Sequence, residues 1–215
     1  MISMKPLIRF PLWLRRLLER DWPSLRRFYR DSLIAFISGI LISLIAFPIR
    51  YQLYTDVEYL LYTLRDVNSY PLLQLMGGLD AAQRLSFALR TNLISEPLLL
   101  ILPGLLMLSY PLLILKFLII GLAALPILLD HPQLILAFVP IILLEAAGFT
   151  LSAIAGEHLG RALLRPGTLY GEVGRIKAFK RALGELLRYY SLIVLVLGSS
   201  SILEVCLSLL LDIFR

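Results

Sequence analysis

The order of apolar and polar residues along the chain predicts a series of membrane-spanning helices. Residues 32–49 carry no charged side chain, and residues 134–160 form a long apolar stretch with an acid, Glu145, near its midpoint. At ~1.5 Å per residue, a helix of either length matches a hydrocarbon core of about 30 Å. Further apolar runs, interrupted by prolines and single polar residues, lie at 85–108, 111–129 and 191–211. The pattern therefore predicts about five spans.

The composition places the chain in the bilayer rather than in water. Hydrophobic residues make up 59% of the 215 residues, only 17% are charged, and the mean hydropathy is +0.82. In a soluble domain about half of the residues are apolar. We therefore expect an all-α polytopic transmembrane helix bundle with an N-terminal amphipathic segment, located in the cell membrane. The single Cys206 excludes a disulfide within the chain and a cysteine-based metal cluster.

The net charge of +6 is concentrated in two basic blocks, residues 1–31 and residues 157–190. Both blocks flank apolar runs, so the positive-inside rule explains them more simply than nucleic-acid binding does. The rule places both blocks, and with them the N-terminus, in the cytoplasm. Since the first span leads outside, an odd number of crossings must follow before the second block, and three fit the available length. A fifth span then leaves the C-terminus outside.

We divide the chain into a basic amphipathic cytoplasmic segment, residues 1–31, and a single transmembrane domain, residues 32–215. The first segment is interrupted by prolines and suits the surface of an anionic leaflet, where it either orients the first span or binds a partner. Within the domain, residues 50–84 carry five tyrosines and are expected to form an outer interfacial segment or to dock a partner. Residues 157–190 form a basic cytoplasmic connection.

A row of small residues accompanies Glu145 on its helix. Gly148, Ser152, Gly156 and Gly160 recur at every fourth position and share the arc of Glu145, so this face should pack against protein rather than lipid. A charge at the centre of a span costs on the order of 2.5 to 3.5 kcal/mol, so Glu145 must be protonated, hydrogen bonded or in contact with water. It either locks two helices together, belongs to a transport or proton path, or contacts another subunit.

Further polar residues lie within the predicted spans, namely Asn92, Glu96, Lys116 and Glu204. Lys116 is expected a turn or two inside the cytoplasmic face, where its long side chain can reach the headgroups, so it needs no functional role. Glu96 and Glu204 fall in the outer halves of their predicted spans. Glu145 is the deepest of the set.

No catalytic constellation is recognisable in the sequence. It lacks a Gly-x-Ser-x-Gly elbow, a Walker loop and a His-Glu-x-x-His zinc helix. His131 and His158 are expected on opposite faces of the bilayer, which argues against a metal site built on both. The glycine-rich tract at 167–174 matches no nucleotide motif and is interpreted as a flexible turn. We therefore predict a non-enzymatic protein with no catalytic residue, no metal and no cofactor.

The polar residues, prolines and glycines that interrupt the apolar runs of residues 87–160 occur in a definite order. Phe87 and Asn92 open the second span, and Gly104 and Gly121 lie within the second and third spans. In the fourth span, Pro140 is followed five residues later by Glu145. After the acid come small residues: Ala146, Ala147, Gly148, Gly156 and Gly160.

This order resembles the stage II sporulation protein M family of polytopic membrane proteins, whose fourth span usually reads Pro-His-Gly-x-x-Glu-x-Pro-Ala and ends in Leu-x-x-Gly. The chain departs from that pattern where Ile141 and Ile142 replace the His-Gly pair and Ala147 replaces the second proline. The resemblance implies five spans and a non-enzymatic role. Sporulating members of the family anchor a membrane complex that contains cell-wall remodelling enzymes.

Two functions follow as hypotheses. The first is a non-enzymatic integral membrane scaffold or complex subunit that recruits proteins through its outer tyrosine-rich segment and its basic segments. Its expected partners are the bilayer and other membrane subunits, or further copies of the chain joined through the face from Gly148 to Gly160. The alternative is a permease-type subunit of a transporter, with a polar path around Glu145 to which Asn92 or Glu96 contributes. Helices interrupted by proline suit this alternative, as at Pro97, Pro103 and Pro140.

Overall fold

The computed structural model of the protein describes residues 12–46, 81–130, 132, 135–171 and 174–213. Within these ranges nearly every residue is helical and no strand occurs, so the prediction of an all-α protein is confirmed. The elements, in chain order, are α1 (Leu12–Ala46), α4 (Ala81–Arg90), the π-helical η3 (Thr91–Ser95), α5 (Glu96–Gly104), α6 (Ser109–Asp130), α7 (Ile135–Leu164), α8 (Gly167–Tyr170) and α9 (Arg175–Ile213).

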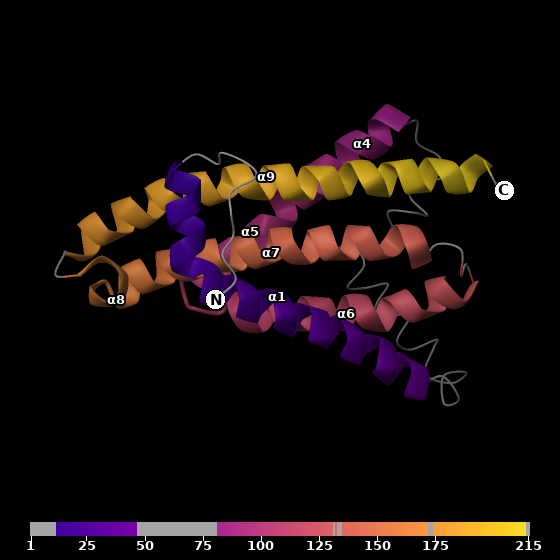
Figure 1. The fold of residues 1–215 in the computed structure, drawn as a ribbon, viewed down its shortest axis with the longest axis horizontal. Helices are drawn as coiled ribbons and strands as arrows, with labels where there is room; N and C mark the ends of the chain where they lie inside the picture. Colours follow the sequence, from indigo (N-terminus) through magenta and orange to yellow (C-terminus); the bar gives the residue numbers. More distant parts are fainter. Residues whose placement is uncertain (1–11, 47–80, 131, 133–134, 172–173, 214–215) are drawn as a thin grey trace.

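The described residues form five helical passes that run alternately in opposite directions along the long axis of the molecule (Figure 1). The passes are α1, the continuous run of α4, η3 and α5, then α6, α7 and α9. Within the residues whose side chains are described, α6 contains the apolar stretch Ser109–Leu125. The other passes contain stretches long and apolar enough to cross a membrane, namely Glu19–Ala46, Ala81–Gly104, Phe138–Leu164 and Arg175–Leu207. Many leucines and isoleucines on these helices stay exposed, as expected for surfaces that face lipid.

The first pass is part of a longer helix than the sequence predicted. α1 begins at Leu12, well before residue 32, and continues through Pro23. Proline lacks the backbone N–H and its ring crowds the preceding turn, which accounts for the bend in the N-terminal third of α1 (Figure 1). The basic segment predicted as a separate surface element therefore runs directly into the first span. Residues 1–11 and residues 50–80 of the predicted interfacial segment lie outside the described residues.

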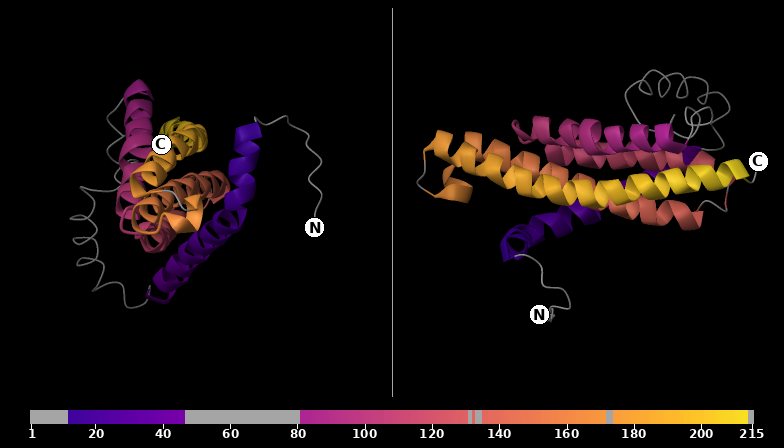
Figure 2. Two further views of the ribbon diagram at one scale, coloured as in Figure 1. Left: turned by 90° about the vertical axis from the view of Figure 1, so that its left-hand side faces the viewer. Right: turned by 90° about the horizontal axis from the view of Figure 1, so that it is seen from above.

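The second basic block is also largely helical. It comprises the end of α7, the single turn α8 and the first turns of α9, which project beyond the turn between α5 and α6 (Figure 2). The first turns of α1 lie at the same end of the bundle (Figure 1). We call this end, formed by the beginnings of α1 and α9, the end of α7 and all of α8, the basic end. The described parts of both basic blocks therefore share one end of the molecule.

α7 is the central helix of the bundle. Every residue from 151 to 160 is buried, because α5, α6, α9 and α1 all pack against this helix. The row of small residues lets two of these neighbours approach closely. A side chain at Gly160 would overlap the carbonyl oxygen of Gly104 in α5, and one at Gly148 would overlap Leu197 in α9. Ser152 is buried between them and donates a hydrogen bond to the carbonyl of Gly148 at 3.0 Å.

A second close helix contact joins α1 and α6. A side chain at Gly121 would overlap the backbone carbonyl of Phe36, and one at Gly39 would overlap the carbonyl of Leu118. In lipid, association of helices depends on such close packing, because the tails are as apolar as the side chains. The glycines therefore fix the positions of α5 against α7 and of α1 against α6.

Replacing Gly156 by leucine should separate α5 from α7. A Cβ at Gly156 would lie 2.9 Å from the carbonyl oxygens of both Leu100 and Ile101, and backbone atoms cannot move aside as a side chain can. We expect Gly156→Leu to lower the stability of the protein in mild detergent by about 3 kcal/mol or more, measured by thermal unfolding. Gly198→Leu is the matched control, because a Cβ there meets nothing within 4 Å. Equal stabilities of the two variants would contradict this packing.

Candidate functional site

The polar residues predicted within the spans lie where η3 contacts α9 and where α5 contacts α6. Asn92, on η3, donates from Nδ2 to Ser201 Oγ at 3.1 Å and to Glu204 Oε2 at 3.3 Å, both on α9. Lys116 on α6 forms an ion pair with Glu96 at the start of α5. We call the set Asn92, Glu96, Lys116, Glu145, Ser201 and Glu204 the intramembrane polar network.

Glu145 on α7 belongs to the same network. Its carboxyl group interacts electrostatically with Lys116 on α6 and with Glu204 on α9. The ammonium of Lys116 also lies 3.9 Å from the centre of the Phe149 ring, one turn further along α7. The network therefore draws side chains from four of the five passes, namely the second, third, fourth and fifth.

The π-helical turn that carries Asn92 has a local cause in the sequence. Pro97 has no backbone N–H, so it cannot bond to the carbonyl of Leu93 four residues earlier. The hydroxyl of Tyr190 on α9 donates to that free carbonyl instead, at 2.6 Å. The N–H of Glu96 bonds to the carbonyl of Thr91, five residues back, which is the wider turn of a π-helix. The irregular turn directs Asn92 toward α9.

Two residues of the network lie in settings that the sequence did not predict. Lys116 was expected to extend toward the headgroups, but its ammonium is held within the bundle by Glu96. Glu96 was expected in the outer half of its span, yet it lies nearer the basic end, because the pass begins at Ala81 and ends at Gly104. The charges of Lys116 and Glu96 therefore neutralise one another, and this ion pair lies nearer the basic end than Glu145 does.

The network holds more acids than bases. It contains three carboxyl groups, from Glu96, Glu145 and Glu204, and one ammonium, from Lys116. An uncompensated charge among apolar helices is costly, so carboxyls without a cation are stable there only as neutral acids or beside water. The excess of carboxyls over cations therefore requires neutral acids, hydrogen-bond partners or water in this part of the bundle.

A separate polar cluster joins three helices at the basic end. Asp21 on α1 is only 6% exposed, and it accepts hydrogen bonds from Tyr189 of α9 and from its neighbour Arg20. His158 on α7, 4% exposed, places Nε2 3.3 Å from Asp21 Oδ1 and Nδ1 3.3 Å from Arg20 Nη2. Nε2–H can thus donate to Asp21 while Nδ1 accepts from Arg20.

Arg20 completes this cluster by binding Glu185 of α9 through two bonds of 2.9 and 2.8 Å. Tyr170 of α8 donates to the same carboxylate at 3.1 Å. Burial and the charge of Glu185 raise the pKa of Tyr170, so its hydroxyl remains a donor at neutral pH. We call Arg20, Asp21, His158, Glu185 and Tyr189 the basic-end cluster.

The basic-end cluster was not predicted from the sequence. His158 was expected only on the face of the bilayer opposite to His131, and neither Asp21 nor Glu185 was singled out. The one available signal was that these acids occur where basic residues dominate. Which acids pair with which residues depends on the packing of α1 against α7 and α9, and spacing along the chain does not reveal it.

Within the described residues, no three His, Cys, Asp or Glu side chains are arranged to hold a metal ion. The fold and the two clusters define a polytopic α-helical membrane protein with polar side chains both inside the bundle and at one end. No protein-family model matches the chain, and neither a curated protein nor a solved structure matches it.

Removing the hydrogen bond between Asp21 and Tyr189 should destabilise the protein, and the effects of changing the two residues should not be additive. Asp21→Asn weakens the acceptor and Tyr189→Phe removes the donor hydroxyl, so each change weakens or removes this buried hydrogen bond. We expect each variant to lose about 1 to 3 kcal/mol and the pair to show an interaction energy of at least ~0.5 kcal/mol in thermal unfolding. Strictly additive losses would contradict a direct bond.

Proposed function

We propose that the protein is a non-enzymatic scaffold subunit of a membrane complex, and that its basic end recruits an acidic partner. The observation that carries this proposal is the distribution of charge at the basic end. Three acids there, Asp21, Glu157 and Glu185, are turned inward and paired, while several basic side chains are exposed. The exposed set at the tip, which we call the basic tip, is Arg165, Arg175, Lys177 and Lys180.

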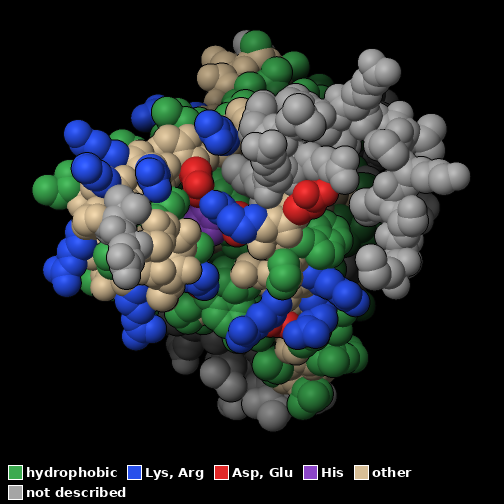
Figure 3. Space-filling view, turned by 60° about the vertical axis from the view of Figure 1, so that its left-hand side comes forward, with side chains coloured by type: hydrophobic (Ala, Val, Ile, Leu, Met, Phe, Trp, Pro, Cys, Tyr) green, Lys and Arg blue, Asp and Glu red, His purple; other side chains and the backbone are tan. Residues whose placement is uncertain are grey.

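The pairing of the acids leaves the surface positive. Asp21 and Glu185 belong to the basic-end cluster, and the buried Glu157 is bonded to Arg161 at 2.8 Å. Residues of the basic tip form no ion pair with any described residue, and lysine and arginine side chains surround this face (Figure 3). A positive surface held in fixed geometry favours a negatively charged partner and speeds its association.

The positive-inside rule supports a cytoplasmic location for the basic end and therefore for the partner. The resemblance to the stage II sporulation protein M family also supports a subunit of a membrane complex. The small-residue face of α7 is an unsuitable site for a further subunit, because α5 and α9 of the same chain already occupy it at Gly148, Gly156 and Gly160. We therefore assign partner contacts to the basic tip.

Reversing the charge of the basic tip should release the partner. We expect the protein, extracted from its native membrane in mild detergent, to retain a stoichiometric acidic protein that the triple variant Arg175→Glu, Lys177→Glu, Lys180→Glu loses. Because the attraction is electrostatic, salt should weaken it, by roughly tenfold between 0.1 and 0.5 M. The measurement is the ratio of the two proteins after size-exclusion chromatography.

Arg26→Glu serves as the control, since Arg26 is exposed on α1 and lies outside the basic tip. The control variant should keep the partner. A wild-type chain that purifies without any partner, or a partner that the triple variant also retains, would contradict the scaffold function.

The intramembrane polar network supports a second candidate, a permease-type subunit of a transporter with a polar path around Glu145 that conducts protons. A single acid paired with Lys116 would be enough to hold two helices together. The network contains three carboxyl groups beside this one ammonium group, which is more than such a structural role requires. Ionisable groups that face one another inside a bundle are typical of proton and ion paths. The irregular turn at η3 and Pro97 also resembles the interrupted helices of transporters.

Glu145→Gln should abolish proton movement if this second function is correct. Purified protein in liposomes is given a potassium diffusion potential, and acidification of the interior is followed with a trapped pH dye. We expect uptake by wild-type protein to exceed that of empty liposomes by roughly tenfold and Glu145→Gln to match the empty liposomes, because the amide cannot carry a proton. Glu19→Gln, on the surface of α1, is the control. Uptake by Glu145→Gln at the wild-type rate would exclude this path.

A further inference from the structure

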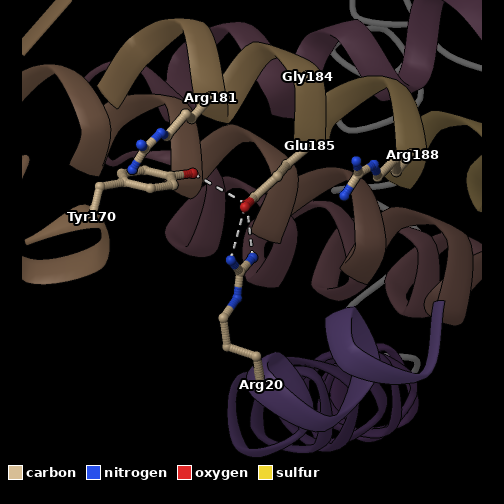
Figure 4. A pocket seen from close by; sticks show the side chains of 6 residues that line it. All are labelled: Arg20, Tyr170, Arg181, Gly184, Glu185 and Arg188. Carbon is tan, nitrogen blue, oxygen red and sulfur yellow. Dashed lines mark hydrogen bonds and ion pairs between the residues drawn. The ribbon is translucent and has the colours of Figure 1, made fainter. Parts of the chain in front are cut away.

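A pocket opens at the surface beside the basic-end cluster. It has a volume of about 420 Å³ and is lined by Arg20, Tyr170, Arg181, Gly184, Glu185 and Arg188. α9 contributes four of these residues, while α1 and α8 form the opposite walls (Figure 4). Neither proposed function uses this pocket.

The charge in the pocket is positive and available to a ligand. Arg181 and Arg188 are exposed, and neither forms an ion pair with a described residue. Their guanidinium groups lie on either side of Glu185, as Figure 4 shows. The carboxylate of Glu185 is turned away from them and is occupied by Arg20 and Tyr170. Its oxygens are therefore already bonded and are not directed at Arg181 and Arg188.

The space between the two arginines is open. Gly184 lies between them on α9, and a Cβ at this position would meet nothing within 4 Å. Arg181 and Arg188 are separated by two helical turns, roughly 10 Å along the axis, so their flexible side chains can converge on one group placed over Gly184. The planar guanidinium matches the oxygens of phosphate and binds them through paired hydrogen bonds. The pocket thus suits a phosphate-bearing anion.

The same face of α9 continues into an apolar surface. Arg181, Arg188, Leu195 and Ile202 follow one another at seven-residue intervals, so they lie on nearly the same side of the helix. Leu195 is 67% exposed and Ile202 is 54% exposed. Along α9 from the basic end toward the bundle, one side of the helix therefore presents two arginine side chains followed by two apolar side chains. This order matches the headgroup and acyl chains of a phospholipid.

We propose that this pocket binds the phosphate headgroup of an anionic phospholipid between Arg181 and Arg188, with the acyl chains lying along Leu195 and Ile202. The pocket is a surface distinct from the basic tip and from the intramembrane polar network. The proposal therefore holds whether or not either proposed function is correct. A lipid bound here also contacts Tyr170 and Arg20, and so rests against the junction of α1, α8 and α9.

Native mass spectrometry of the full chain in a neutral detergent tests this site. Phosphatidylglycerol is titrated against phosphatidylcholine of the same chain length, and the bound fraction is measured for each. We expect phosphatidylglycerol to bind roughly tenfold more tightly, because phosphatidylcholine carries a cation that opposes the two arginines. The double variant Arg181→Gln, Arg188→Gln should lose this preference. Arg175→Gln, Lys177→Gln removes the same charge outside the pocket and should keep it.

Two further measurements separate the lipid from other occupants. Glycerol phosphate carries the headgroup chemistry without acyl chains, and it should compete only at a concentration at least roughly tenfold higher than that of the lipid. Gly184→Leu leaves every charge in place but fills the open space, and it should weaken phosphatidylglycerol binding without lowering the unfolding temperature.

Equal binding of the two lipids, or an unchanged preference in the double variant, would overturn the site. Unaltered binding by Gly184→Leu would place the lipid elsewhere on the surface. Competition by glycerol phosphate at the concentration of the lipid itself would show a site for a soluble phosphate and would overturn the assignment of a lipid.

Discussion

The burial of Asp21 is the constraint on which the arrangement of the basic end depends. A carboxylate removed from water loses hydration worth several kcal/mol, so it persists only where other groups replace that hydration. Arg20, His158 and Tyr189 supply the replacement from α1, α7 and α9. These helices are distant in sequence, and bringing their side chains to one carboxylate places both basic blocks at one end. The excess of exposed arginines and lysines at that end follows from the same pairing, because it turns Asp21 and Glu185 inward.

The middle of the bundle is organised by a different interaction. Close backbone contacts at Gly104, Gly156 and Gly160 fix α5 against α7. The turn that precedes α5 in the same pass, η3, contacts α9. Polar side chains from four passes consequently meet around Glu145. In the basic-end cluster, Arg20, His158 and Tyr189 bind the two carboxylates, whereas the intramembrane polar network has more carboxyls than cations. The former holds α1, α7 and α9 together, and the latter supports the proposed proton path.

The sequence was sufficient to predict the class of fold, because apolar runs of spanning length and the charge between them are local properties. It also singled out Glu145, Asn92, Glu96, Lys116 and Glu204, since a polar residue in an apolar run is conspicuous. It could not show that Lys116 pairs with Glu96, because that contact depends on how α5 and α6 are turned. Pro23 suggested a break, yet α1 continues through it, since tertiary contacts hold the bent helix on both sides.

The most direct test of this account is the side of the membrane on which the two basic blocks lie. With Cys206 replaced by serine, single cysteines at Arg26 and at Arg175 are labelled in sealed vesicles with a maleimide that cannot cross the bilayer. The Asp21 interactions require both positions to react from the same side, which the positive-inside rule identifies as the cytoplasm. Labelling from opposite sides would contradict the shared basic end, and with it the topology of the five passes.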